Sequence, residues 1–400
     1  MTHLNGLNIS NFISFKGNAT QTEGADKIKT SEPKGATLPP VLKQDTFVKS
    51  TPSETSKIEQ YDDDYDEEYE KEQAKWLQKR LSELDKAAQN LESQTLEELR
   101  CILELRLSLQ YEAPEAEPSL KTIADTIISK LDKESVDTKE AADIWRLMSV
   151  NTDCMTENAD RELSRIIAHA SILLHSIGQE RYQANFDTLQ EAFKDINAEF
   201  SGRVKTAKSI EEKIPHRIKN NLRNGENLFN ATSDICGYRL VTDGSNEQGE
   251  KIMERIEKLT KDGKYTLFSI SSHGENPYIS KDEIERLHDE KGFEYTIKQY
   301  PGFTGTNIIL KDKEDKKLEI QIIGKEVNKI NIKEHKFYKL WTLSEDEHRK
   351  YFTSRRDIGA YEEYMNACYA YARGLELGTI DKNTEKPELP EGLCEDLRLI

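Results

Sequence analysis

The sequence predicts a mixed α+β protein in which a helical module precedes a β-sheet domain. Three observations support this prediction. Apolar residues recur at steps of three and four between residues 73 and 200, which is the spacing of amphipathic helices. Short apolar runs bounded by turn residues follow over 235–323, with helical segments between them. Residues 1–60 are rich in Thr, Ser, Asn, Lys and Pro, and they lack a periodic apolar pattern.

The composition of the 400-residue chain limits its class. A formal net charge of -17 argues against general affinity for nucleic acid, because neutralisation of phosphates carries such binding. The five cysteines form no CxxC pair, which favours a reducing compartment and no zinc site. Neither an apolar leader nor eighteen consecutive apolar residues are visible, so we expect a cytoplasmic protein that does not interact with membranes.

The first half of the chain divides into a tail and a helical module. We expect residues 1–72 to be a disordered tail and an acidic linker, and the run YDDDYDEEYEKE is either a solvated strip or a cover for a basic site. Residues 73–178 form the expected helical module. It contains no motif for catalysis or metal binding, and it could bind a protein partner. Its later helices are expected over 119–132, 138–150 and 157–178, the last ending at Gly178.

The second half of the chain is expected to hold the sheet domain, over residues 179–345. A helix over 181–200 leads to Gly202, and a second helix covers 246–261. After an expected helix break near 342–344, a helical extension occupies 346–376, in which the helix itself is expected to end at Gly374, and a loose tail over 377–400 completes the chain. The expected strands are 235–241, 265–271, 293–298, 306–311 and 317–323.

A basic stretch precedes the first expected strand. Ser209 followed by Glu212 predicts a capping box and a helix that begins at Ser209. A helix N-terminus with cations beside it is suited to binding phosphate, and a solvated basic surface is the alternative. The basic residues of this stretch are Arg203, Lys205, Lys208 and Lys213.

Two acidic residues belong to different expected strands. Asp234 stands where the strand 235–241 begins, and Glu319 shares one face of the strand 317–323 with Gln321. A buried carboxylate is costly without a partner, so a solvent-facing position is the alternative for Glu319. Beside a group of cations, two carboxylates from two strands have the chemistry to hold Mg²⁺ on a polyphosphate.

An aromatic residue stands between two glycines ahead of the strand 306–311. Phe303 follows Gly302 and precedes Gly305, and it looks exposed. Such a residue is suited to stacking on a nucleobase, whereas a turn with one aromatic packed beneath it is the alternative.

Together these motifs resemble the synthetase domain of the RelA/SpoT homologues, the (p)ppGpp synthetases. The order and spacing agree over about 200–341. The resemblance implies a nucleotidyltransferase-like fold and transfer of the β,γ-pyrophosphate of ATP to a ribose 3′-hydroxyl, with release of AMP. The matching motifs are Arg203-x-Lys205-x3-Ser209-Ile210-x2-Lys213, Asp234-Ile235-Cys236-Gly237-Tyr238-Arg239, Gly302-Phe303, Glu319-Ile320-Gln321-Ile322 and Glu334-His335-Lys336-Phe337-Tyr338.

The resemblance also implies roles for single residues. Asp234 and Glu319 would hold Mg²⁺, and Glu319 would take the proton of the 3′-hydroxyl. Arg239 is assigned to the acceptor, although its strand parity opposes Asp234 unless Gly237 marks a bulge. The expected ligands of the ATP phosphates are Arg203, Lys205 and Lys213, with Lys208 and Ser209 beside them. The other expected acceptor ligands are Phe303, Asn307 and Gln321.

Departures from the family pattern all fall on the acceptor side. The family usually has Tyr at Phe303, His at Asn307 and an Arg-Thr pair at Ile323-Gly324. GDP or GTP is therefore the leading acceptor, and another 3′-hydroxyl, of an adenosine nucleotide or the 3′ end of tRNA, is the alternative. A third interpretation is a non-catalytic nucleotide-binding scaffold. The protein could also form a homo-oligomer.

Overall fold

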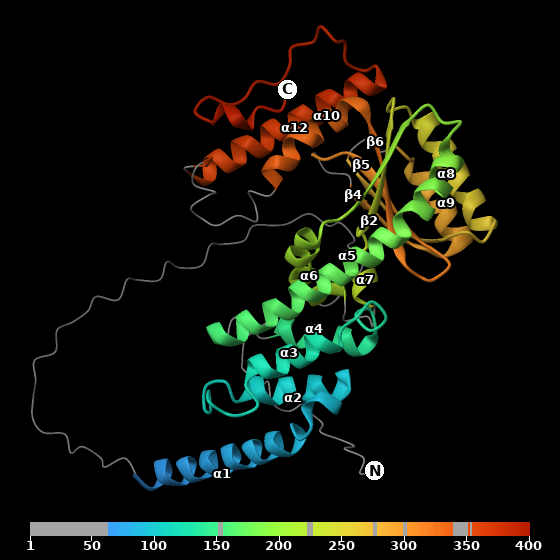
Figure 1. Ribbon diagram of the computed structural model, residues 1–400. Helices are drawn as coiled ribbons and strands as arrows, with labels where there is room; N and C mark the ends of the chain where they lie inside the picture. Colours follow the sequence, from blue (N-terminus) through green and yellow to red (C-terminus); the bar gives the residue numbers. More distant parts are fainter. Residues whose placement is uncertain are drawn as a thin grey trace, which may run out of the picture. The chain divides into compact units, whose positions relative to one another are not determined.

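The computed structural model describes residues 63–150, 155–221, 227–274, 278–298, 302–338, 351–352 and 354–400. These residues form a mixed α+β structure with one six-stranded sheet flanked by helices, as the sequence predicts (Figure 1). The predicted N-terminal tail, up to residue 62, and the predicted helix break near 342–344 lie outside the described residues.

Five helices precede the sheet in the described chain. The acidic run expected to be a linker is helical from Asp63 onward, because acidic side chains are favoured at the positive end of the helix dipole. Thr95 and Thr156 cap two of the later helices through their side chains. The helices are α1 (Asp63–Ala87), α2 (Leu96–Ser108), α3 (Leu120–Lys130), α4 (Lys139–Val150) and α5 (Glu157–Phe193).

The expected helix end at Gly178 is wrong, because α5 runs through this residue and ends at Phe193. A Cβ atom at Gly178 would stand 2.7 Å from a methyl group of Ile235 and 3.0 Å from one of Val204. The glycine is needed because the helix packs very closely on the sheet at this point, and it does not act as a stop signal. One buried apolar cluster accordingly extends from Leu84 in the helical module to Ile322 in the sheet.

The sheet contains one strand that the sequence did not predict. Residues Glu199–Val204, expected to lie in a helix end and a loop, form an edge strand that pairs antiparallel with the next strand. Its exposed residues alternate with partly buried ones, so it lacks the apolar run that marked the other strands. The strand order is β1-β2-β6-β5-β3-β4. The strands are β1 (Glu199–Val204), β2 (Cys236–Thr242), β3 (Thr266–His273), β4 (Glu294–Lys298), β5 (Gly305–Lys311) and β6 (Lys317–Gly324).

The two faces of the sheet differ in chemistry. Tyr238 of β2 stacks on Tyr182 of α5, with ring centroids 5.7 Å apart, and belongs with Ile320 to the face that helices cover. In Figure 1, α8 (Asn246–Lys261) and α9 (Lys281–Lys291) lie to the right of the sheet, whereas α10 (Lys325–Tyr338) and α12 (Arg355–Leu377) lie to its upper left. The face opposite Tyr238 carries mostly polar residues, and the candidate site lies there.

The C-terminal region is packed, in contrast to the expected loose tail. Helix α12 continues past Gly374 to Leu377, where Gly378 ends it in the left-handed conformation with a φ of 68°. Leu397 and Leu399 are buried, and the Leu399 backbone N–H donates to the Tyr364 hydroxyl at 2.9 Å. The tail is therefore anchored by apolar side chains close to its end. Within the described ranges, no helix combines the length and apolar character needed to cross a membrane.

Candidate functional site

The centre of the candidate site is a carboxylate held by two ammonium groups. Asp234 lies just before β2, and its Oδ2 accepts a hydrogen bond from Lys205 Nζ and one from Lys213 Nζ, the latter at 2.5 Å. Lys205 follows β1, and its backbone N–H donates to the Ile235 carbonyl at 2.8 Å. The β1–β2 pairing, which the sequence did not predict, thus brings the first lysine to the acid.

Helix α6 (Ala207–Asn221) supplies the second lysine. The expected helix start at Ser209 is wrong, since Thr206 Oγ1 accepts from the Ser209 backbone N–H at 3.2 Å and the helix starts at Ala207. Thr206 acts as the cap because it directly precedes the helix, where its side chain reaches a backbone N–H of the first turn. His175 of α5 donates through Nδ1 to the Lys205 carbonyl at 2.8 Å and fixes the turn between β1 and α6.

The charges of this group shift the pKa values of its members. Burial raises the pKa of Asp234, but Lys205 and Lys213 outweigh it and lower that pKa to about 2. The pKa of Lys205 is lowered to about 8, mainly by burial. The negative charge of Asp234 raises this pKa, and the positive charge of Lys213 lowers it further. Asp234 is therefore ionised at neutral pH, and Lys205 is still an ammonium there but loses its proton at a lower pH than a solvated lysine.

Glu319 of β6 belongs to the same electrostatic group. Its pKa is raised by burial and then by the negative charge of Asp234, while Lys213, Lys205 and Arg203 act in the opposite direction. Among the described residues, the Glu319 carboxylate makes no ion pair. The structure therefore brings both predicted acids and three of the four predicted cations into electrostatic contact.

The register of the strands arranges these side chains in rows across the polar face. Arg203 of β1, Gly237 of β2 and Glu319 of β6 are opposite one another, so their side-chain positions share one face. A Cβ atom at Gly237 would meet nothing within 4 Å, so the space above this residue is open. The pairing shows no bulge at Gly237. Asp234 precedes the strand, so strand parity does not constrain it.

A second row runs beside the first. Arg239 pairs with Gln321, which in turn pairs with Asn307 of β5. Gln321 Nε2 donates to Asn307 Oδ1 at 3.3 Å, and Arg239 Nη1 donates to Asn328 Oδ1 of α10 at 3.2 Å. Burial lowers the pKa of Arg239, helped by Arg203 and opposed by Glu319. Arg239 therefore faces the same side as the two acids.

Phe303 lies in the loop before β5, and it is partly buried, in contrast to the expected exposed position. Its ring lies over Gly305, where a Cβ atom would stand 2.6 Å from Phe303 Cζ. The ring meets Tyr369 of α12 edge-on at 6.1 Å and His273 of β3 at 5.9 Å. These contacts hold the ring on the polar face of the sheet. The ring fits there because Gly305 has no side chain.

Some site residues were not foreseen, and one expected residue lies apart. Lys208 points outward, with 70% of its side chain exposed, and pairs with Glu211 at 3.7 Å. Ser271 and His273 stand two residues apart on the polar face of β3. This spacing of polar residues could have identified them in the sequence as site residues. Tyr369 and Asn328 come from helices after the sheet, and no local signal ties either of them to the site.

The donor set fits a magnesium ion. Asp234 Oδ1 is buried and has no hydrogen-bond partner among the described residues, so one carboxylate oxygen is left for a ligand. No group of three or more His, Cys, Asp or Glu side chains within reach of one ion occurs in the described part of the chain. Two carboxylates are sufficient for Mg²⁺, which keeps several waters and takes further oxygens from substrate phosphates.

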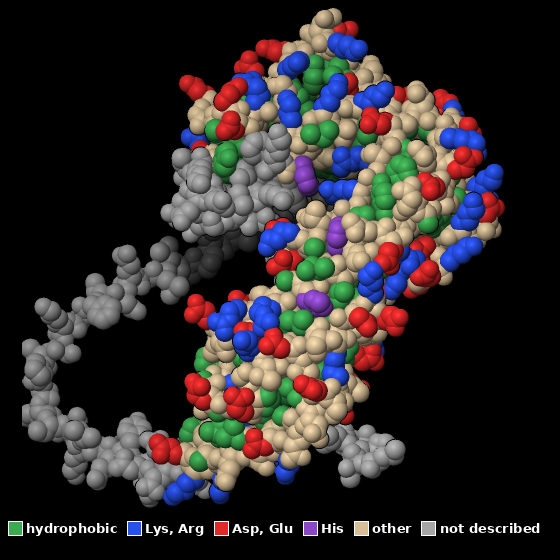
Figure 2. All heavy atoms as spheres, in the orientation of Figure 1, with side chains coloured by type: hydrophobic (Ala, Val, Ile, Leu, Met, Phe, Trp, Pro, Cys, Tyr) green, Lys and Arg blue, Asp and Glu red, His purple; other side chains and the backbone are tan. Residues whose placement is uncertain are grey.

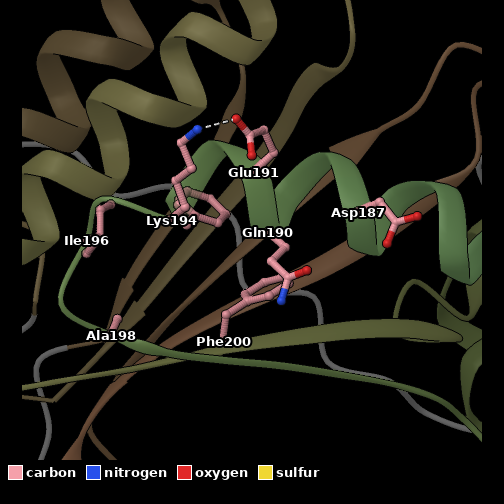
Figure 3. A pocket seen from close by; sticks show the side chains of 8 residues that line it. Asp187, Gln190, Glu191, Lys194, Ile196, Ala198 and Phe200 are labelled. Atoms are coloured by element: carbon pink, nitrogen blue, oxygen red, sulfur yellow. Dashed lines mark hydrogen bonds and ion pairs between the residues drawn. The ribbon is translucent and has the colours of Figure 1, made fainter.

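A shallow depression elsewhere on the surface is a weaker candidate. It has a volume of about 490 Å³ and lies between the end of α5 and β1 (Figure 3). Its one basic side chain, Lys194, is paired with Glu191 at 2.5 Å, and Phe200 lies on the face opposite Arg203. In Figure 2, basic and histidine side chains instead gather in the hollow below α10 and α12. The residues that line the depression are Asp187, Gln190, Glu191, Phe193, Lys194, Ile196, Ala198 and Phe200.

A scan of the chain against protein-family models finds no match, and a search of the curated proteins finds no related sequence.

Proposed function

We propose that the protein transfers the β,γ-pyrophosphate of ATP to the 3′-hydroxyl of GDP or GTP on a nucleotidyltransferase-like fold, as the resemblance to the RelA/SpoT synthetases implies. One observation carries the proposal. Asp234, just before β2, and Glu319 of β6 lie in one electrostatic group with Arg203, Lys205 and Lys213. Two acids beside several cations are the requirements of a site for a metal-bound polyphosphate.

The donor side binds and orients ATP in this proposal. Arg203 gives a planar fork for two phosphate oxygens, and the lysines supply point charges. When bound, Mg²⁺ would be held by Asp234 and Glu319 and would neutralise charge on the phosphates. On binding, the phosphates would take over Lys205 and Lys213, which pair with Asp234 in the described structure. Lys208 is left out of the set because it points away.

The chemical step is an in-line displacement at the β-phosphorus of ATP. The acceptor 3′-oxygen forms a bond to this phosphorus while the bond to the oxygen that bridges the α- and β-phosphorus breaks, and AMP leaves with that oxygen. Glu319 takes the proton of the hydroxyl, and its raised pKa makes it a stronger base than a solvated carboxylate. Phe303 would stack on the acceptor base, with Gln321, Asn307 and Arg239 beside it.

One departure from the family pattern has a structural explanation. Gly324, where the family usually has Thr, lies against the carboxylate of Glu376, which reaches in from α12. Glu376 Oε1 accepts from the backbone N–H groups of Glu326 and Val327, each at 2.9 Å, at the start of α10. Glu376 of α12 therefore occupies the space that a larger side chain at residue 324 would need.

A second function is favoured by the altered acceptor side. Phe303 lacks the usual hydroxyl and Asn307 replaces the usual His, so the acceptor could be an adenosine nucleotide or the 3′ end of tRNA. A third, non-catalytic interpretation is an ATP-binding scaffold. All three interpretations share the donor site, and they differ only in the fate of the bound ATP.

The deciding experiment incubates the protein with Mg²⁺, γ-labelled ATP and one acceptor at a time. The panel contains GDP, GTP, ADP and tRNA, with Asp234→Asn as the inactive control and Lys208→Ala as the matched control outside the site. We expect labelled guanosine product together with an equal amount of AMP. Label on tRNA and never on GDP would overturn the guanosine proposal. Bound ATP without AMP release would favour the scaffold.

A further inference from the structure

The loop between α3 and α4 reaches from the helical module to the sheet domain through one side chain. Asp137 is 6% exposed in its side chain, and both of its carboxylate oxygens are used. Oδ1 accepts from the Phe229 backbone N–H at 2.6 Å, and Oδ2 accepts from Lys316 Nζ. A buried carboxylate with two partners from distant parts of the chain is a fixed point.

The first partner leads to one of the two acids. Phe229 belongs to the single-turn helix α7 (Leu228–Ala231), which is followed by Thr232, Ser233 and then Asp234. The Ile235 backbone N–H donates to the Thr232 carbonyl at 3.0 Å, so this short connection is folded on itself. A shift of α7 would therefore be passed directly to Asp234.

The second partner leads to the other acid. Lys316 lies in the turn between β5 and β6, three positions before Glu319. Asp312 Oδ1 accepts from the Lys316 backbone N–H at 3.0 Å and makes the turn compact. Arg181 of α5 holds the same turn by donating from Nε to Asp312 Oδ2 at 3.1 Å. The start of β6 is thus fixed from the helical side of the molecule.

Asn230 ties the two connections together. Its Nδ2 donates to the Asp315 carbonyl at 2.7 Å, and its Oδ1 accepts from the Lys317 backbone N–H at 2.9 Å. The segment that ends at Asp234 and the segment that begins β6 are therefore bonded to each other as well as to Asp137.

We infer that Asp137 is a positioning residue that sets the separation of Asp234 and Glu319, so that the helical module is part of the catalytic unit. The metal-binding role of the two acids rests on the proposed function, whereas the mechanical coupling does not. Loss of the Asp137 carboxylate would leave the Lys316 ammonium without its partner and release both segments at once.

The experiment measures amide hydrogen exchange and the affinity for Mn²⁺ with ATP in three full-length variants. Asp137→Asn keeps the size of the side chain and removes the charge. Lys316→Met removes the ion pair with Asp137 and leaves the hydrogen bond from the Phe229 backbone N–H to Asp137 in place. Glu180→Gln is the matched control, because Glu180 pairs with Lys133 of the same loop but reaches neither acid.

In Asp137→Asn we expect faster exchange over 228–236 and 317–324 together, and an affinity for Mn²⁺ with ATP that is lower by roughly tenfold. Lys316→Met should speed exchange over 317–324 more than over 228–236, and Glu180→Gln should affect neither segment. Unchanged exchange over 228–236 in Asp137→Asn, or a uniform rise over the whole chain, would overturn the inference. Failure of the wild type to bind Mn²⁺ with ATP would count against the proposed function, and the exchange data would still decide the coupling.

Discussion

Arg239 and Gln321 lie opposite each other on the parallel strands β2 and β6, and both side chains rise from the sheet face that carries Glu319. The pairing continues to Asn307 on β5, so one guanidinium and two carboxamides form a row. This row lies on the same face as the row that holds Arg203 and Glu319, two residues further along β2 and β6. In the proposed function, the row with Arg203 and Glu319 would face the phosphates, and the row with Arg239 and the two carboxamides would face the acceptor nucleoside.

The two acids provide the first prediction. Asp234→Asn and Glu319→Gln should each lower the rate of AMP release by roughly 100- to 10,000-fold, because each removes one ligand charge and the second also removes the base. The change is measured as the initial rate at saturating ATP and acceptor, with circular dichroism to check the fold. Lys208→Ala should keep the wild-type rate. A variant at either acid with wild-type turnover would show that the metal site is misplaced.

Phe303 provides a prediction about the acceptor. Phe303→Ala should raise the KM for the acceptor by roughly tenfold or more and change the KM for ATP little, because base stacking is worth about 1–3 kcal/mol. The two constants are measured separately, each with the other substrate saturating. Equal increases in both would contradict a stacking role.

Tyr369 and Tyr361 form a matched pair on α12, which holds Phe303 in place. The Tyr369 hydroxyl donates to Glu334 Oε2 at 3.2 Å, whereas the buried Tyr361 hydroxyl has no hydrogen-bond partner among the described residues. Tyr369→Phe should therefore lower the free energy of unfolding by about 1 kcal/mol, and Tyr361→Phe should leave it unchanged or raise it. Urea unfolding measures both values, and the reverse order would refute this assignment of the two hydroxyls.

The pH dependence of ATP binding follows from Lys205. Its pKa is lowered to about 8, so the ammonium that attracts phosphate is present below this pH and is lost as the pH rises through it. The Kd for ATP should therefore rise roughly tenfold between about pH 7 and pH 9. Calorimetric titration over this range is the measurement. Lys205→Met should bind weakly at every pH and lose the slope, and a wild-type Kd independent of pH would exclude Lys205 from phosphate binding.

The contact of α12 with the end of β6 gives a prediction about stability. Glu376 and Arg373 are 1% and 4% exposed in their side chains and pair at 3.2 Å. Glu376→Ala should lower the free energy of unfolding by about 3–5 kcal/mol, because the Arg373 charge stays buried without this partner.

Glycines offer the control for this contact. Gly324→Ala should also destabilise the protein, because its new Cβ would collide with the Glu376 carboxylate. Gly359 lies on α12, as Glu376 does, and a Cβ atom there would meet nothing within 4 Å. Gly359→Ala should therefore raise the free energy of unfolding by about 0.5–1 kcal/mol. Thermal unfolding of the three variants tests the set, and a stable Gly324→Ala variant would refute the close packing.

Much of the fold follows from local sequence patterns. The helix over Asn246–Lys261 has the expected bounds, and five strands lie within two residues of their expected positions. Two of the errors concern packing: Gly178 lies in a close helix–sheet contact, and polar side chains hid the strand β1. In both cases the deciding contact was with a segment distant in the sequence, so no local pattern could reveal it.

The sequence by itself determined the alternation of helices and strands and the shared face of Glu319 and Gln321, and it singled out the residues that we propose for phosphate and metal binding. These features depend on neighbours along the chain and on the periods of helix and strand. Only the tertiary structure decided that Lys205 and Lys213 meet Asp234, that Arg239 shares the face of Glu319, and that Asp137 fastens the helical module to both acids. Strand register and the burial of charge arise from contacts between distant segments, which is why the sequence left them open.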